Sequence, residues 1–289
     1  MSGVAVPVAV PRPRPAWVRW LRRYGLAALG GAIILAWVLA AILAPWILSY
    51  GPNTVDVANR LKPPSAMHWL GTDALGRDVL ARVVYGARIS LSVGMAVVLV
   101  GGLFGTLLGA VAAYARGWAE EALMRVTDLV FCFPPIILAM AIAAALGIGT
   151  VNTVIAMLVV WWPKFARLAR SLVLTQRSLE YVEAAQSVGF GPAHILVRQI
   201  IPNAVGPLIV LVTLDLGQAI LVFAGLSFLG LGVVPPTAEW GAMVAEGREL
   251  VQQWWVATFP GLAILSVVMG FNFVGDGIRD WLDPHARTR

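Results

Sequence analysis

Four kinds of residue in this sequence could supply the chemistry of a catalytic or binding site: an acid, a serine, three histidines and a single cysteine. Asp215 is the acid, and it lies alone in a long apolar run. Ser227 lies between the glycines of segment 225–230, but the spacing is not the G-x-S-x-G of a nucleophile elbow. No histidine accompanies this serine, so the sequence does not predict a serine hydrolase.

The remaining reactive residues predict no metal or nucleotide site. His68, His194 and His285 all lie outside the apolar runs, and no H-E-x-x-H zinc pattern occurs. Cys132 is alone, which excludes an intrachain disulfide and a cysteine-cluster metal site. A phosphate-binding loop of the type G-x-x-x-x-G-K-[ST] is also missing, so the chain is not expected to bind ATP by itself. We therefore expect no catalytic residue, no metal and no cofactor.

The composition places the chain in a membrane. Of its 289 residues, 59% are hydrophobic and 12% are charged, and the mean hydropathy is +0.81. A soluble domain carries roughly 25% charged residues, so this chain cannot cover a globular surface with charge. A soluble enzyme, a disordered chain and a fibrous repeat are excluded. The net charge of +6 lies at the predicted membrane edges, so no nucleic-acid partner is expected.

Apolar runs of about 20 residues, the length that crosses a bilayer, predict an all-α membrane protein. Lys164 and Arg167 are expected to snorkel to the headgroups. The uncharged run 129–162 has 34 residues and would be about 51 Å long as one helix, so we expect a turn near Gly147. The six predicted transmembrane helices are residues 25–49, 89–115, 124–146, 150–169, 206–230 and 254–276.

Asp215 is the one charge in the fifth predicted span. The 14 Leu, Ile, Val and Phe residues between 208 and 230 contribute about −6 kcal/mol to insertion, against roughly +3 kcal/mol for a central Asp. The span should therefore insert despite the acid. An ionisable residue at this depth faces a bundle interior or water. A carboxylate that lines a transport pathway and a hydrogen-bonded structural carboxyl both fit, and Asp215 is our candidate for the pathway.

The distribution of basic residues predicts cytoplasmic termini. With that orientation 15 Lys and Arg lie inside and 6 outside, as the positive-inside rule requires. Residues 1–24 then form a cytoplasmic arm, extended where prolines recur over 7–15. Residues 50–87 form an external loop, and residues 279–289 form a cytoplasmic tail.

The connection at residues 170–205 is too long to be only a turn, since helix–helix turns need 2–8 residues. It is basic, and its composition is helical. A helix is predicted to start near residues 178–180 and to end at Gly189, where the chain must turn. The sequence therefore presents a short helix to the cytosol between two membrane spans.

This short helix has a surface with little side-chain bulk. Glu183, Ala184 and Ala185 follow one another on it, so another protein could approach closely and Glu183 could pair with a basic partner. A second short helix is expected over residues 193–201, ending at Pro202.

These residues carry a family resemblance. Glu183-Ala184-Ala185, followed by Gly189 and by Ile-Pro-Asn at 201–203, resembles the EAA loop of ATP-binding-cassette importer permeases. Gln199 departs from that loop pattern, which usually has Ile. Other segments resemble the outer loop and last spans of the dipeptide, oligopeptide and nickel permeases, in particular their C-type subunit: 68–78, 85–91, 226–232, 235–236, 239–241 and 275–277. The resemblance covers residues 67–284.

The resemblance implies a type I importer fold in the plasma (inner) membrane, core residues 88–278, with this chain as one of two pore-forming subunits. A homologous second permease, two cytosolic ATP-binding subunits and an external substrate-binding protein would complete the importer. Such a system would carry peptides or nickel chelates by alternating access. Its ATPase-coupling loop would consist of Glu183, Ala184, Ala185, Gly189 and Pro202. An ion-coupled secondary transporter that uses Asp215, and a membrane enzyme, are the alternatives that the sequence leaves open.

Overall fold

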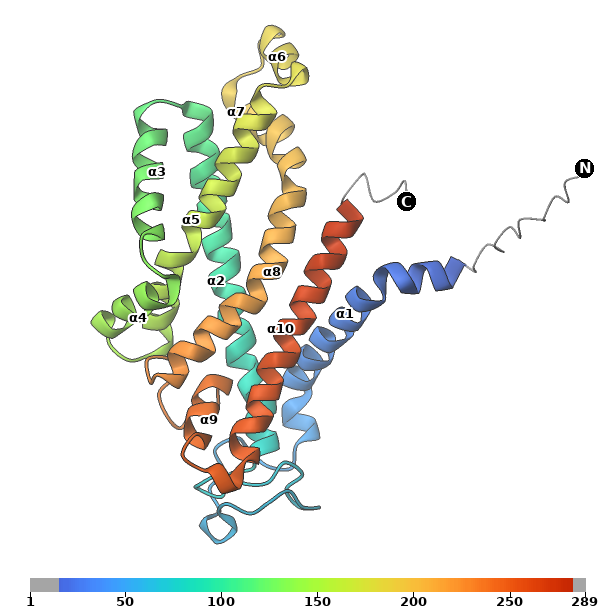
Figure 1. The fold of residues 1–289 in the computed structure, drawn as a ribbon, viewed down its shortest axis with the longest axis vertical. Coiled ribbons are helices and arrows are strands. Elements are labelled where there is room, and N and C mark those ends of the chain that lie inside the picture. Colours follow the sequence, from blue (N-terminus) through green and yellow to red (C-terminus); the bar gives the residue numbers. More distant parts are fainter. Residues whose placement is uncertain (1–15, 283–289) are drawn as a thin grey trace, which may run out of the picture.

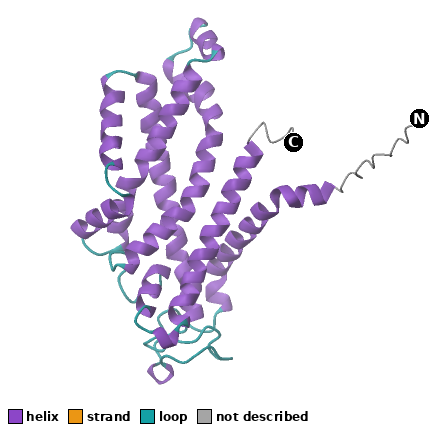
Figure 2. Cartoon of the chain, in the orientation of Figure 1, coloured by secondary structure: helices purple, strands orange, loops and turns teal. Residues whose placement is uncertain are grey.

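The chain folds as a bundle of helices in the computed structural model, which describes residues 16–282 (Figure 2). Within that range the only β pairing is a single bridge between Thr72 and Asp78. The predicted all-α class is confirmed. The main helices are α1 (Ala16–Ile47), α2 (Val79–Ala115), α3 (Trp118–Phe131), α4 (Pro135–Leu146), α5 (Thr150–Arg177), α6 (Glu180–Ser187), α7 (Pro192–Ile195), α8 (Ile201–Phe228), α9 (Trp240–Gly247) and α10 (Trp255–Leu282). Short turns η1 (Val57–Asn59), η2 (Leu196–Ile200) and η3 (Val251–Gln253) complete the order.

The long helices α2, α5, α8 and α10 form the body of the bundle, and α1 packs along α10 (Figure 1). In a bilayer, helices associate through close packing, because lipid is as apolar as their side chains. Glycines of α2 permit that packing: a Cβ on Gly105 would lie 2.2 Å from the Trp162 carbonyl oxygen, and one on Gly109 would lie 2.1 Å from that of Ala166. The α2 and α5 backbones can therefore touch, with Phe165 of α5 fully buried beside them.

The prediction of one straight span over residues 124–146 is wrong. Two helices occupy this region, α3 and α4, and they are bent by 91° at the break between them. The break falls at Pro134 and Pro135, which cap and start α4. Proline has no N–H to donate and its ring clashes with the preceding turn, so α3 cannot continue through this pair.

Four helical segments of residues 16–282 are long and apolar enough to cross a membrane, or five if the bent pair α3–α4 counts as one span. The four are Tyr24–Ile47, Val79–Ala115, Pro192–Phe228 and Trp255–Leu282. The 28-residue helix α5, which carries Lys164 and three arginines, is not among them. The predicted count of six is therefore not reached by length and composition alone.

The helix expected over residues 193–201 does not end at Pro202. Instead α7, the π-helical turn η2 and α8 follow one another without interruption from Pro192 to Phe228. Pro202 lies in the first turn of α8. Proline has no N–H to donate, and this missing donor coincides with the irregular hydrogen bonding of the π-helical turn directly before it.

Two predicted boundaries also move. Helix α1 begins at Ala16, within the arm assigned to residues 1–24, and the proline-rich part at 7–15 lies outside the described residues. Helix α2 begins at Val79, within the loop assigned to residues 50–87. Asp78 caps it, since its carboxylate accepts a hydrogen bond of 2.7 Å from the Ala81 N–H.

The bundle has two different ends (Figure 1). Helices α6 and α7 lie beyond one end, where α8 begins. Helix α9 and the loop between α1 and α2 lie together at the opposite end. Any site on α6 is thus separated from any site on the outer loop by the length of the bundle.

Candidate functional site

The short helix α6 is anchored by one face and exposed on the other. Val182 and Ala185 are buried against Ile195 and Ile200, at the start of the α7–α8 segment. Glu183 and Ala184 are exposed. The sequence predicts that all three EAA residues share one smooth surface, but Ala185 turns inward and packs.

Gly189 ends α6 with the geometry that the sequence predicted. Its φ is +92°, a value that side chains with a Cβ rarely adopt. The Gly189 N–H donates to the Gln186 carbonyl at 2.9 Å, and the Phe190 N–H donates to the Ala185 carbonyl at 3.2 Å. This pair of bonds is a Schellman motif. It fixes the direction in which the chain leaves α6.

The tip beyond α6 is apolar. Val188 is 76% exposed, and Phe190 is 45% exposed although its ring stacks on His194 with a 4.5 Å centroid separation. Exposed apolar residues beside the acidic Glu183 are typical of a surface that another protein covers. Pro202 lies behind this tip, at the start of α8, rather than on it.

Asp215 does not stand alone in its span. Its Oδ2 lies 2.6 Å from Nζ of Lys164, which comes from α5. The ammonium also lies 4.2 Å from the ring centroid of Trp161, a cation–π distance. Lys164 thus points into the bundle toward α8, and the prediction that it snorkels to the headgroups is wrong. Opposite charge within hydrogen-bonding reach is a better environment for the ammonium than lipid.

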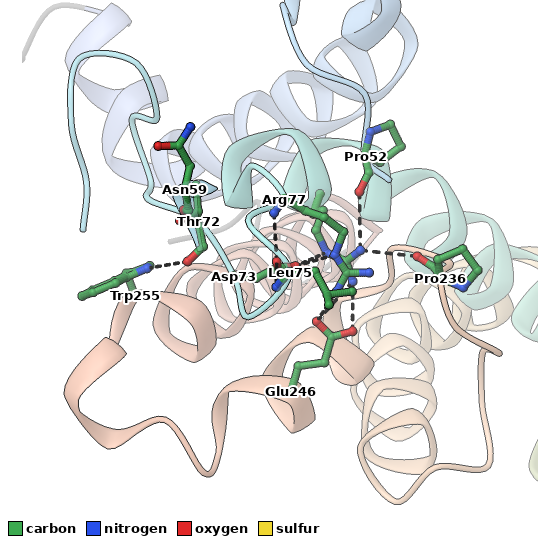
Figure 3. A network of polar contacts seen from close by, with 10 residues as sticks. Pro52, Asn59, Thr72, Asp73, Leu75, Arg77, Pro236, Glu246 and Trp255 are labelled. Atoms are coloured by element: carbon green, nitrogen blue, oxygen red, sulfur yellow. Dashed lines mark hydrogen bonds and ion pairs between the residues drawn. The ribbon is translucent and has the colours of Figure 1, made fainter. Parts of the chain in front are cut away.

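A second group of charges joins the outer loop to α9 (Figure 3). Arg77 Nε lies 2.6 Å from Asp73 Oδ2, and Arg77 Nη2 lies 3.0 Å from Glu246 Oε2. Arg82, whose side chain is 1% exposed, reaches the other oxygen of Glu246 at 3.0 Å. Arg82 also donates to the Pro236 carbonyl at 3.3 Å. Two guanidinium groups and two carboxylates therefore tie three segments together.

A third polar contact closes the same end of the molecule. Glu239 caps α9, accepting hydrogen bonds from the Gly241 N–H at 3.0 Å and the Ala242 N–H at 2.9 Å. The Ser90 hydroxyl of α2 donates to it at 3.0 Å. Burial raises the pKa of the Glu239 carboxyl, and these hydrogen bonds oppose that rise. The segments 85–91 and 239–241, distant in sequence, meet here.

Sequence reasoning identified Asp215 but missed its partner Lys164 and the outer charge network. A signal existed for the pair: an acid lay deep in one predicted span, and a base lay five residues inside the end of the span before it. Arg77, Arg82 and Glu246 gave no such signal, because charges in an outer loop and near it are ordinarily solvated.

The outer network should stabilise the fold. We expect Glu246→Gln to cost about 1–3 kcal/mol, since it leaves two largely buried guanidinium groups with a neutral partner. Glu249→Gln is the matched control: Glu249 is 80% exposed in its pair with Arg248, and such pairs contribute about 0–1 kcal/mol. Thermal unfolding in detergent measures both variants. Equal midpoints for the two would show that the network does not hold α9.

Comparison with known proteins agrees with this architecture. Residues 105–288 match the family described as binding-protein-dependent transport system inner membrane component, and residues 16–64 match the N-terminal transmembrane domain of oligopeptide transport permease C. Helix α1 and the first part of the outer loop therefore lie in one matched region, and helices α3 to α10 lie in the other.

Three relatives extend over nearly the whole chain. The probable D,D-dipeptide transport system permease protein DdpC of Escherichia coli K12 is 45% identical over 262 residues, 90% of this chain and 88% of that protein. The dipeptide transport system permease protein DppC of Alkalihalophilus pseudofirmus is 44% identical over 93% of this chain and 88% of its own length. The glutathione transport system permease protein GsiD of Pectobacterium atrosepticum is 43% identical over 95% of this chain and 92% of its own length. The chain therefore belongs to the family of multi-pass inner-membrane components of binding-protein-dependent transport systems, and it is a transport permease of the oligopeptide permease C type.

Proposed function

We propose that this chain is one of two pore-forming subunits of an ATP-driven importer of peptides. The relatives named above are permeases for D,D-dipeptides, dipeptides and glutathione. These proteins are 43–45% identical to this chain over at least nine-tenths of its length, which supports the same cargo class here. Nickel chelates are the second cargo class, supported only by the resemblance of the sequence motifs.

The importer would contain four further components. A homologous but distinct permease would supply the other half of the pathway, and an external substrate-binding protein would deliver the cargo. Two cytosolic ATP-binding subunits would hydrolyse ATP, since no phosphate-binding loop occurs in this sequence. The observation that carries the proposal is the exposed helix α6, placed beyond one end of an apolar bundle with Glu183, Val188 and Phe190 uncovered.

Helix α6 would dock in a cleft of an ATP-binding subunit. Because Val182 and Ala185 anchor α6 on Ile195 and Ile200, a displacement of α6 pulls on the segment that continues into α8. Asp215 lies on α8 near the middle of that helix. Closure of the ATPases would in this way change the packing of the spans, and the pathway would open alternately to the two sides of the membrane.

Six crossings with both termini in the cytoplasm fit the proposed importer. The bent pair α3–α4 would be the third crossing and α5 the fourth. This topology is supported by the ends of the bundle: α10 ends toward the end that carries α6, and the loop between α1 and α2 lies at the other end (Figure 1).

Cysteine labelling tests the topology. Ala58 and Ser178 are exposed positions at the two ends of the molecule. In a Cys132→Ala background, we expect Ala58→Cys to react with a membrane-impermeant maleimide in intact cells, and Ser178→Cys only after the inner face is opened. Labelling of both positions from the same side would contradict the six-span arrangement.

Cargo class is tested in cells that contain the complete transport system. Removal of this chain should abolish uptake of labelled di- and oligopeptides, and its return on a plasmid should restore uptake. Nickel uptake is measured in parallel. Uptake of nickel without peptide would replace the first cargo class by the second, and uptake of neither by the wild-type system would refute the cargo proposal.

A further inference from the structure

We infer that Lys164 binds the C-terminal carboxylate of the transported peptide inside the membrane, in competition with Asp215. This inference rests on the proposed function, because it names the chemical group of the cargo that the pathway recognises. Lys164 belongs to no motif that led to the family.

The pair lies within two of the predicted membrane spans rather than at their ends. Asp215 is nine residues from the start of the span predicted over 206–230, which is about 14 Å along a helix. Lys164 is five residues from the end of the span predicted over 150–169, about 8 Å from that edge. A lysine side chain could snorkel over that distance, yet the ammonium turns to Asp215 at 2.6 Å.

The two partners differ in their access to the outside of the chain. The Asp215 side chain is 6% exposed, whereas that of Lys164 is 24% exposed. The carboxylate is enclosed within this subunit, and the ammonium can be reached from beyond it. An ammonium facing lipid at this depth would be costly, so the exposed part of Lys164 is best satisfied by a polar path between two subunits.

Hydrogen-bonding capacity is left over at the pair. An ammonium has three donors, and within residues 16–282 only Asp215 is within ion-pair distance of Lys164. Trp161, whose ring lies beneath the ammonium, is 2% exposed, and its indole N–H acts on the Asp215 carboxylate without reaching normal hydrogen-bond geometry. Asp215 Oδ2 is close to the ammonium but makes no hydrogen bond of normal geometry. The pair is therefore neutral in total and incompletely satisfied.

A carboxylate is the ligand that this arrangement suits. It would bring acceptor oxygens to the free ammonium donors, and every linear peptide carries one at its C-terminus whatever its side chains are. Asp215 competes for the same ammonium, so the cargo is held weakly and can be released. A transport site must bind strongly enough to admit its cargo and weakly enough to release it.

The test removes the ammonium of residue 164 by mutation and then restores it by chemical modification of a cysteine. Lys164→Cys in a Cys132→Ala background is assembled with cysteine-free partner subunits in proteoliposomes that contain the complete importer. Uptake is measured for a tripeptide with a free C-terminus and for its C-terminal amide, before and after treatment with an aminoethyl thiosulfonate, which rebuilds a side chain ending in an ammonium. A sulfonatoethyl thiosulfonate, which installs an anion, is the matched reagent. Arg167→Cys, one turn along α5 and outside the pair, controls for general effects of labelling.

We expect Lys164→Cys to lower uptake of the free acid about 10- to 100-fold relative to the amide. This fold-change corresponds to the loss of one charge-assisted hydrogen bond. The aminoethyl reagent should restore the preference for the acid, and the sulfonatoethyl reagent should not. The neutral double variant Lys164→Met/Asp215→Leu, which leaves no unpaired charge, should show the same lost preference. An unchanged acid-to-amide ratio in either variant, while the wild-type importer transports peptide, would overturn the inference. No peptide uptake by the wild-type importer would instead refute the proposed function.

Discussion

Gly189→Val should weaken the docking of α6 and lower substrate-stimulated ATP hydrolysis. A β-branched residue at φ +92° costs about 1–2 kcal/mol, and it would break the Schellman turn that directs the chain out of α6. The turn is exposed, and nothing lies within 4 Å of the position that a Cβ would occupy. The spans should therefore insert normally. Substrate-stimulated ATPase activity of the assembled complex should fall about tenfold or more, because 1–2 kcal/mol corresponds to about 5- to 30-fold and the loss of docking contacts adds to that cost.

Gly189→Asn is the matched control, because Asn is the side chain that tolerates left-handed backbone best. It should retain most of the stimulated activity. Full stimulation in the Gly189→Val complex would show that the α6 turn takes no part in coupling.

Glu183→Lys tests the same surface by charge. Glu183 and Glu180 both lie in the first turn of α6, where each interacts favourably with the helix dipole by about 0.3–1 kcal/mol. Glu180→Lys therefore reports the dipole effect alone. A larger loss of ATPase stimulation in Glu183→Lys is expected if Glu183 contacts a basic group of the ATP-binding subunit, and equal losses would remove that role.

Asp215→Leu should be among the most destabilising single changes in the spans. It leaves the Lys164 ammonium without its counter-charge, which costs about 3–5 kcal/mol for a buried pair. Asp215→Asn, which can still accept a hydrogen bond, should cost less and should impair uptake less. Adding Lys164→Met to Asp215→Leu should recover most of the lost stability, because the unpaired charge is removed. Unfolding in detergent micelles measures each variant.

The neighbouring pair Arg167–Asp128 supplies the comparison. Its side chains are 50% and 60% exposed, so Asp128→Leu should cost at most about 1 kcal/mol. If Asp215→Leu is no more destabilising than Asp128→Leu, the buried pair does not contribute as its geometry indicates.

The sequence predicted the elements that depend on local chemistry. The lengths of the apolar runs predicted the all-α membrane class. Gly189 predicted the end of a helix and the turn of the backbone at that residue. The break before Pro135 was equally local, since two consecutive prolines interrupt an apolar run. The count of uncharged residues did not predict this break, because length and hydropathy take no account of the backbone N–H that proline lacks.

Contacts between distant segments could not be predicted in the same way. Lys164 and Asp215 are 51 positions apart and meet only because α5 and α8 cross at that height. Arg82 and Glu246 are 164 positions apart. Each side chain alone fits a solvated or snorkelling role, and only the packing of the helices shows that the charges neutralise one another. The direction of Ala185, inward rather than outward, follows from the same packing.

ATP-driven peptide uptake by the reconstituted importer is the most direct test of the central claim. The chain is combined in proteoliposomes with the homologous permease, the two ATP-binding subunits and the substrate-binding protein, and a labelled peptide is supplied on the side of the binding protein. Uptake should require ATP, the binding protein and this chain, and an imposed ion gradient should not replace ATP. Uptake that continues without ATP and follows a proton or sodium gradient would contradict the account and favour a secondary transporter that uses Asp215.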